Sequence, residues 1–451
     1  MKNLITLLLV ISASIGAYAQ DEETNIKTGW NVGGVPAITY NTDLGFQYGV
    51  VLNLFDYGDG TKYPSYNQMF YIEASRFTKG SSIYRIMFNS ETLIPGISLT
   101  SDLAYLTDQA FDFYGYNGYD AVYNQTWTDD EQADDIYKTR MFYKTDRKLF
   151  RFKNDLNGRL AGDYWKWNAG FEIRSFNIDK VDIEKLNKGK DEDDPKRLPE
   201  EEETLYEKYL RWGILGDEEA DGGFITTIKG GITYDSRDFK SNAMKGIWFE
   251  TGVEASPSFI SEVGFAKFYA IWRQYFTIVP EDLSLAYRLG YQTTIGGEVP
   301  FYYQNQIITS VLSGATSEGL GGSKNLRGVQ RNRIIGDGLF YGNVELRWKA
   351  FRFNLINQNF YIGLVAFSDF GMVTKKVDFT IPVLEDGAGE PDEGLNETDF
   401  FLSDNESMHV SAGAGLRIVM NENFIIAADF GKAFNEQDGN SGFYIGLNYL
   451  F

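Results

Sequence analysis

The sequence predicts an all-β protein, a transmembrane antiparallel β-barrel of about 16 strands with long extracellular loops. The first observation is an alternation of apolar and polar residues with a period of two along many segments. The second is the composition, because aromatic residues make up 16% of the chain, glycine is abundant (47) and proline is scarce (10). The third is that no stretch beyond residue 20 approaches the ~18 apolar residues of a membrane helix. A closed barrel is the other structure that satisfies backbone hydrogen bonds inside lipid.

The alternation is clear in residues 339–349, where apolar side chains share one face and polar or charged side chains share the other. A water-soluble β-sandwich could produce such a pattern, but its outer face would rarely be so aromatic. A strand with one side toward lipid and a polar side toward a lumen fits better. The last ten residues, 442–451, follow the same pattern, and one face holds Phe443, Ile445, Leu447, Tyr449 and Phe451.

About sixteen segments carry this pattern, an even number as bacterial barrels require. Tight connections such as 161–163 and 279–281 would be periplasmic turns, and long ones such as 177–223 and 296–338 would be extracellular loops. This alternation places both ends of the barrel domain on the periplasmic side. The expected strands cover residues 29–40, 44–55, 67–78, 82–92, 97–115, 139–160, 164–176, 224–235, 246–256, 263–279, 282–295, 339–350, 359–370, 407–419, 424–434 and 441–451.

The first 19 residues read as a signal peptide rather than as part of the fold. Lys2 provides a positive start, Leu4–Ile15 an apolar region, and Ala17-Tyr18-Ala19 a cleavage site. We therefore expect export, a short periplasmic N-terminus over residues 20–28 and an outer-membrane barrel domain over residues 29–451. The expected location is the outer membrane of a Gram-negative bacterium, where the barrel contacts outer-membrane lipids.

The composition and motifs argue against an enzyme. The chain has no cysteine, which excludes disulfides, thiolate metal sites and a lipidated cysteine, and its net charge of −21 argues against nucleic-acid binding. The glycine-rich stretch GGSKNLRGVQ (321–330) lacks the residue order of a phosphate loop, and GAGLR (413–417) lacks the third glycine of a dinucleotide fingerprint. His409 is the sole histidine and reads as a strand residue. No catalytic residue, cofactor or metal site is expected.

The longest loop, 177–223, contains two acidic runs, and residues 204–212 read as a short amphipathic helix. The acidic runs fit a solvated surface loop, and their spacing matches no calcium-loop template.

A charged set remains that the alternation places inside the barrel. Glu345 and Arg347 share the lumen face of one expected strand, Phe367 and Asp369 share a face of the next, and Arg327 lies on the loop before both. Two interpretations stay open. Arg327 could fold into the lumen and form a bidentate pair with Asp369 or Glu345, because buried charges need partners. Alternatively, each charge faces lumen water.

These residues resemble motifs of the BamA/TamA-type outer-membrane assembly and translocation family, also called the bacterial surface antigen family. Leu326, Arg327 and Gly328 match the apolar-Arg-Gly motif of its sixth loop, although Val329 stands where Phe or Tyr is usual. The stretch FSDFG (367–371) resembles the strand motif that usually partners the loop arginine. The stretches DSRDFKSNAMKG (235–246) and GNVELR (342–347) resemble a turn and a strand of the family, although the usual proline before Lys-Gly is missing.

The C-terminal residues carry a further resemblance. Tyr444, Gly446, Tyr449 and Phe451 resemble the terminal assembly signal of outer-membrane barrels, which the outer-membrane assembly machinery reads during biogenesis by pairing strands at an edge.

The resemblance identifies a barrel-only member without POTRA domains, the periplasmic domains that receive client proteins in the family. It implies protein or lipid insertion or translocation at the outer membrane, with a weak seam between the first and last strands. Whether a separate periplasmic partner recruits clients stays open. Glycine and proline in the first strand fit a weak seam, but glycine also serves ordinary barrel curvature. The alternatives are a passive or plugged pore, a structural barrel without assembly activity, and a surface-exposed binding protein that uses the acidic loops.

Overall fold

The fold is known from a computed structural model of the chain. The structure describes residues 26–61, 66–133, 136–308, 316–355, 358–384, 394–420 and 424–451. The predicted signal peptide over residues 1–19 lies outside the described residues, as do residues 20–25 of the predicted periplasmic N-terminus. Within the described chain no separate folded domain precedes the first strand, which begins at Trp30.

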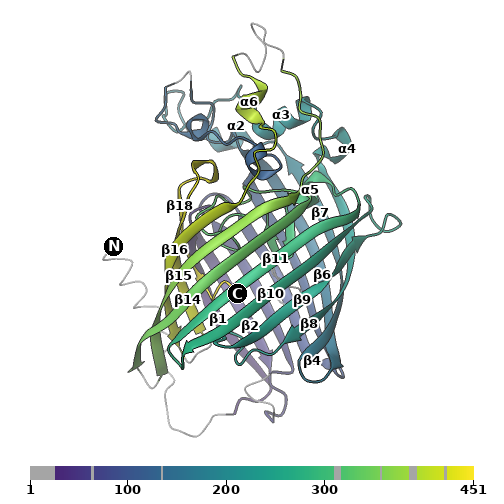
Figure 1. Cartoon of the computed structure of the whole chain (residues 1–451), viewed down its shortest axis with the longest axis vertical. Coiled ribbons are helices and arrows are strands. Elements are labelled where there is room, and N and C mark those ends of the chain that lie inside the picture. The colour runs from purple at the N-terminus through teal and green to yellow at the C-terminus, as the bar shows by residue number, and fades with distance from the viewer. Residues whose placement is uncertain are drawn as a thin grey trace.

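Sixteen strands close into an antiparallel barrel, which confirms the predicted fold class (Figure 1). Each strand pairs with its neighbours in the chain, and β14 follows β11 directly in the wall because β12 and β13 form a small separate sheet. The barrel strands are β1 (Trp30–Asn41), β2 (Gly45–Asp56), β3 (Gln68–Phe77), β4 (Ser82–Ile94), β5 (Ile97–Asp112), β6 (Lys144–Ala161), β7 (Trp165–Asp179), β8 (Gly222–Asp235), β9 (Gly246–Ser256), β10 (Phe265–Val279), β11 (Leu283–Gly297), β14 (Gly338–Leu355), β15 (Gln358–Lys375), β16 (His409–Met420), β17 (Phe424–Ala433) and β18 (Ser441–Leu447).

Long connections gather at one end of the barrel, which we call the loop end, and short turns join the strands at the other, the turn end (Figure 1). The predicted helix over residues 204–212 is α3 (Leu205–Arg211), where Thr204 and Glu207 form a capping box. The other elements are α2 (Ile183–Asn187), α4 (Asp217–Ala220), α5 (Phe301–Gln304), α6 (Glu397–Phe400), β12 (Gln306–Ile308), β13 (Thr316–Glu318) and three short 3₁₀ turns. Among the described residues no helix is long and apolar enough to cross a membrane.

The loops at this end pack into an aromatic cluster, the cap, that covers the barrel. Its ring contacts include Phe113 with Tyr209 (5.2 Å between centroids) and Trp127 with Phe142 (5.0 Å). Two predicted strands were too long at the loop end. The strands expected over 97–115 and 139–160 included residues that belong to the loops, because the aromatic side chains there are buried in the cap and do not form part of the wall. The buried members of the cap include Phe113, Tyr114, Tyr116, Trp127, Phe142, Tyr143, Tyr206, Tyr209, Phe301, Tyr302, Phe400 and Phe401.

Side chains alternate between the lumen and the outer surface along each strand. On β14, Leu346 and Trp348 are 40% and 49% exposed on the outside, whereas the alternating residues Glu345 and Arg347 are 0% and 3% exposed. Exposed apolar side chains on the wall are the surface that lipid would cover.

The end of the chain departs from its predicted strand. The strand expected over 441–451 is wrong beyond Leu447, where β18 ends. Asn448 adopts a positive φ of 69° and turns the last residues away from the wall. The alternation continues to Phe451 in the sequence, but contacts inside the lumen override it.

Candidate functional site

The stretch around Arg327 folds back from the loop end into the lumen. Its guanidinium forms a bidentate pair with Asp369 on β15, at 2.9 Å from Nε to Oδ2 and 3.0 Å from Nη2 to Oδ1. The backbone N–H of Arg327 also donates to Asp369 Oδ2 at 3.0 Å. The two side chains are 1% and 0% exposed. Three convergent bonds to one carboxylate fix both the position and the orientation of the loop.

Arg327 is the centre of a larger ionic network in the lumen. Its Nη1 lies 2.8 Å from Glu345 Oε1, an ion-pair contact that is not aligned as a hydrogen bond, and 3.4 Å from Asp429 Oδ2. Arg347 holds Glu345 at 2.7 Å, and Arg417 holds Asp429 at 2.7 Å. With Asp369, three guanidinium groups balance three carboxylates. This balance offsets the cost of removing the charges from water.

The ring of Phe367 stacks on the face of the same guanidinium. The Cζ atom of Arg327 lies 3.5 Å from the centroid of the Phe367 ring. Stacking on an aromatic face leaves the donors of the guanidinium free for the carboxylates.

The residue after Arg327 must be glycine. Gly328 has a φ of 95°, and an added Cβ would lie 2.5 Å from the carbonyl carbon of Gly431 on β17. Conversely, a Cβ on Gly431 would lie 2.5 Å from the carbonyl oxygen of Arg327. The N–H of Gly328 donates to the hydroxyl of Tyr444 on β18 at 3.2 Å. The loop backbone therefore lies directly against the wall formed by β17 and β18.

Apolar burial holds the rest of the loop in place. Leu326 is fully buried, and Val329, which departs from the aromatic residue usual in the motif, is buried in the same cluster. The cluster also contains Ile307, Leu320, Ile334, Leu339, Tyr341 and Val373. The valine side chain fills this position, so the missing aromatic residue does not disrupt the loop.

Asn325 organises the loop backbone and was not among the residues predicted from the sequence. Its Oδ1 accepts from the N–H groups of Gly321 (2.6 Å) and Leu326 (2.7 Å), and its Nδ2 donates to the carbonyl of Gly319 at 2.7 Å. Asparagine is a common turn former, because its side chain can replace backbone partners. This turn preference of asparagine was the signal in the sequence that could have identified Asn325.

The last residues of the chain lie inside the lumen, below the arginine loop. The guanidinium of Arg347 donates to the main-chain oxygen of Phe451 at 2.9 Å. The same group lies 4.3 Å from the ring centroid of Tyr449 and 4.9 Å from that of Phe451. Phe451 packs with Ala243, Tyr275 and Ala286. Arg347 thus holds the C-terminal tail, which we define as residues 448–451, away from the barrel wall.

The turn over residues 236–245 closes the same part of the lumen. Asp235 and Arg237 form a bidentate pair at 2.8 Å, and the Arg237 guanidinium lies 3.9 Å from the Trp248 ring centroid. Asn242 reaches across to donate to the hydroxyl of Tyr361 on β15 at 2.7 Å. The stretch that resembles a family turn is therefore part of the lumen packing.

The tail leaves the junction between β1 and β18 short. Two residue pairs join the strands, Tyr40 with Ile445 and Asn41 with Tyr444, next to bonds between Thr42 and Phe443. All of these lie at the loop end. We call this junction the seam.

Arg417, Asp429 and the role of His409 were also not predicted from the sequence. Alternation along 407–419 and 424–434 places Arg417 and Asp429 on the lumen face, but their pairing depends on the register between β16 and β17. His409 lies between two carboxylates, 2.6 Å from Asp438 and 3.2 Å from Glu406, and stacks on Tyr119. It ties three connections of the cap together. Across the described ranges no group of three potential metal ligands is present.

Comparisons with known proteins agree with the barrel fold. A solved structure of BamA from Haemophilus ducreyi lacking POTRA domains 1–3 is similar over 98% of this chain and 78% of that chain, with 14% identity and a TM-score of 0.54. CdiB from Escherichia coli is similar over 96% of this chain and 64% of that chain, with 11% identity and a TM-score of 0.55. The chain thus spans less than two thirds of CdiB. At these identities the likeness shows a shared fold.

No relative among functionally curated proteins matches the sequence. The model of the Omp85 superfamily domain, however, matches residues 97–451, which is more than half of the chain. This match includes the arginine loop, its partners on β14, β15 and β17, and the C-terminal tail. The chain belongs to the Omp85 superfamily, whose barrel lies in the bacterial outer membrane.

Proposed function

We propose that this barrel inserts or translocates protein or lipid at the outer membrane, and that it opens toward the membrane at the seam. The observation that carries the proposal is the contrast at β1. Twelve residue pairs join β1 to β2, whereas two join it to β18. In this proposal the loop end faces the outside of the cell and the turn end faces the periplasm.

An incompletely paired strand is a docking edge. Most of β1, from Trp30 to Thr39, has no registered partner on β18. Unpaired backbone groups are costly within lipid, and an exposed strand edge pairs readily with an incoming strand. A segment of a client protein that adds to this edge would satisfy these groups. A lipid would instead pass between β1 and β18, where the two strands are not paired.

The filled lumen favours opening at the wall over flow of solutes along the barrel axis. The cap covers the loop end, and the arginine loop is held in the lumen by Asp369, Glu345 and Asp429. Arg327 in this proposal braces the wall of β14 to β17, so that β1 can move without collapse of the barrel. The same filling also fits the second candidate function, a plugged pore.

The test is to lock the seam. The variant Tyr40→Cys/Ile445→Cys places two thiols on paired residues at the loop end, and the chain has no other cysteine to interfere. The oxidised protein in proteoliposomes should fail to promote membrane insertion of an unfolded outer-membrane barrel protein, and a reductant should restore the activity. In the native organism, depletion of the chain should lower the amounts of other outer-membrane proteins.

The matched control joins β1 to its other neighbour. Ile38→Cys/Tyr48→Cys links paired residues within the β1–β2 hairpin and leaves the seam free. Its oxidised form should remain active. If the locked and control variants insert clients equally well, the seam is not the site of opening. If depletion affects solute uptake alone, the pore is the better account.

A further inference from the structure

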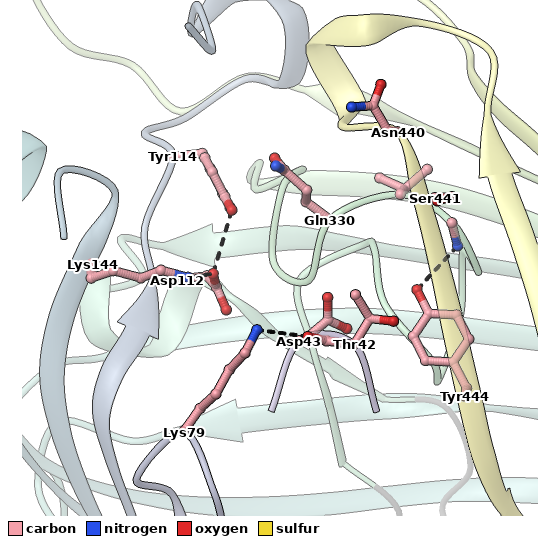
Figure 2. Close-up of a pocket in the computed structure, with 12 residues that line it drawn as sticks. Thr42, Asp43, Lys79, Asp112, Tyr114, Lys144, Gln330, Asn440, Ser441 and Tyr444 are labelled. Carbon is pink, nitrogen blue, oxygen red and sulfur yellow. Dashed lines mark hydrogen bonds and ion pairs between the residues drawn. The ribbon is translucent and has the colours of Figure 1, made fainter. Parts of the chain in front are cut away.

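A polar cavity of ≈ 210 Å³ lies at the loop end, beside the seam (Figure 2). Its lining comes from the β1–β2 and β3–β4 turns, the start of β18, the arginine loop and the adjoining ends of β5 and β6. Figure 2 shows Tyr114 and Lys144 on one side, with Asn440, Ser441 and Tyr444 on the other. Exposed lining residues such as Lys79 and Asn440 connect the cavity with the surface.

Two acceptors in the cavity lining have no protein donor. Asp43 Oδ2 and Gln330 Oε1 are both buried atoms, and neither has a hydrogen-bond partner in the structure. The groups come from different elements, the β1–β2 turn and the arginine loop, and both line the same space. A buried acceptor without a donor costs free energy, so this pair favours a ligand that donates hydrogen bonds.

The charges in the lining balance one another. Two carboxylates, Asp43 and Asp112, face two ammonium groups, Lys79 and Lys144. Lys144 is ion-paired with Asp112, and Lys79 donates to the carbonyl of Thr42 at 2.7 Å. Such a site gives no net preference for a bare cation or a bare anion. A neutral ligand whose groups both donate and accept would match the two acceptors and the lysines together.

Hydroxyl groups have this property, and the cavity has room for one ring that carries several of them. Its volume is below the roughly 300–1,000 Å³ of pockets for drug-sized ligands. We propose that the cavity binds one sugar ring with free hydroxyl groups, in which Asp43 and Gln330 accept and Lys79 donates. The ring would come from a free saccharide or from the sugar headgroup of a glycolipid beside the barrel. This site is independent of the proposed insertion activity, because it does not require the seam to open.

Equilibrium binding of simple sugars tests the proposal directly. The purified protein, in a detergent that carries no sugar, is titrated with a panel of methyl glycosides by ligand-observed NMR. Saturable binding is expected for the wild type. Asp43→Asn or Gln330→Leu should weaken it by about tenfold or more, since each removes an acceptor that the ligand would satisfy. Vesicles with and without a glycolipid then distinguish the two sources of the ring.

The control is Asp163→Asn, which changes an 84% exposed carboxylate at the turn end and should leave binding unchanged. Heat-modifiability on gels shows that each variant still forms the barrel, and Gln330→Leu keeps the test valid if Asp43→Asn does not fold. Absence of saturable binding to every sugar by the wild type would overturn the proposal. So would equal affinity in the wild type and both variants, or competition by calcium or inorganic phosphate alone at the same residues.

Discussion

Strand β1 has two neighbours in the barrel, and they hold it very differently. With β2 it pairs over its full length, from Trp30 opposite Asp56 to Asn41 opposite Gly45. With β18 it pairs at Tyr40 and Asn41. The same backbone therefore forms a complete ladder on one side and a short one on the other. On the β18 side the strand ends at Leu447 and the last residues turn into the lumen, so most of β1 has no β18 residue opposite it.

The comparison connects the seam to the arginine network. Arg347 binds Glu345, Glu345 contacts Arg327, and the same Arg347 holds Phe451. The charged network that fixes the loop thus also fixes the group that draws the tail inward. Substitutions along this series of contacts should affect the pairing of β1 with β2 and with β18 to different extents.

The largest effect is expected when the charge of Arg327, at the centre of the network, is reversed. Arg327→Glu places a carboxylate among Asp369, Glu345 and Asp429, and breaking a buried pair costs about 3–5 kcal/mol. We expect loss of the heat-modifiable folded form on gels. The double variant Arg327→Glu/Asp369→Arg should recover part of it. Additive defects in the double variant would show that the two side chains do not interact.

A smaller loss should follow from closing the space between the loop and the wall. Gly431→Ala introduces a Cβ 2.5 Å from the carbonyl oxygen of Arg327, and overpacking of this kind costs about 1–3 kcal/mol. The melting temperature of the barrel should fall. Gly230→Ala is the control, because nothing lies within 4 Å of its added Cβ. Equal melting temperatures for the two variants would argue against close contact at Gly431.

Releasing the tail from the lumen should change the β1–β18 junction without unfolding the barrel. Arg347→Gln removes the donor to Phe451 and the stacking partner of Tyr449. We expect the tail to leave the lumen and the seam to lengthen, seen as faster proteolysis or stronger cross-linking of the tail. The control is Arg352→Gln, another arginine of β14, which pairs with Asp282 at the turn end. An unchanged tail in Arg347→Gln would show that other contacts hold it.

The filled lumen predicts small, irregular currents in planar bilayers, because the cap and the arginine loop obstruct the axis of the barrel. Large, steady currents from the wild type would instead support an open pore and would contradict the brace role of Arg327.

The smallest effect concerns pH at the loop end of the seam. Burial, and then the carboxylate of Asp112, raise the pKa of Asp43 to about 6, against the opposing charges of Arg331, Lys144 and Lys79. A raised pKa means that the folded protein binds this proton more tightly than the unfolded chain. The contribution to stability is thus greatest below the ordinary value of 3.8 and is lost as the pH rises through about 6.

The wild type should therefore melt at a slightly higher temperature at about pH 5 than at about pH 7.5, relative to Asp43→Asn, which lacks the titrating group. A wild type and variant with parallel pH profiles would show that Asp43 does not titrate in this range.

Much of the architecture could be predicted from the sequence, because alternation is a local property of each strand. Alternation also placed Glu345, Arg347 and Asp369 on lumen faces, and the motif resemblance placed Arg327 among them. The tail could not be predicted in this way. Residues 448–451 alternate like a strand, but long-range contacts with Arg347 decide their position. The aromatic residues at 113–114 and 142–143 were misassigned for a similar reason, since aromatic rings suit both a lipid-facing wall and a buried cap.

The most direct measurement compares the two junctions of β1 from one shared position. Ile38 pairs with Tyr48 across the hairpin, and continued pairing across the seam would place it opposite Leu447. Disulfide formation is measured in native membranes for Ile38→Cys/Tyr48→Cys and for Ile38→Cys/Leu447→Cys. We expect rapid, complete oxidation of the first pair and slow, partial oxidation of the second. Equal rates would mean that β1 and β18 stay paired as far as Leu447 and would contradict the short seam.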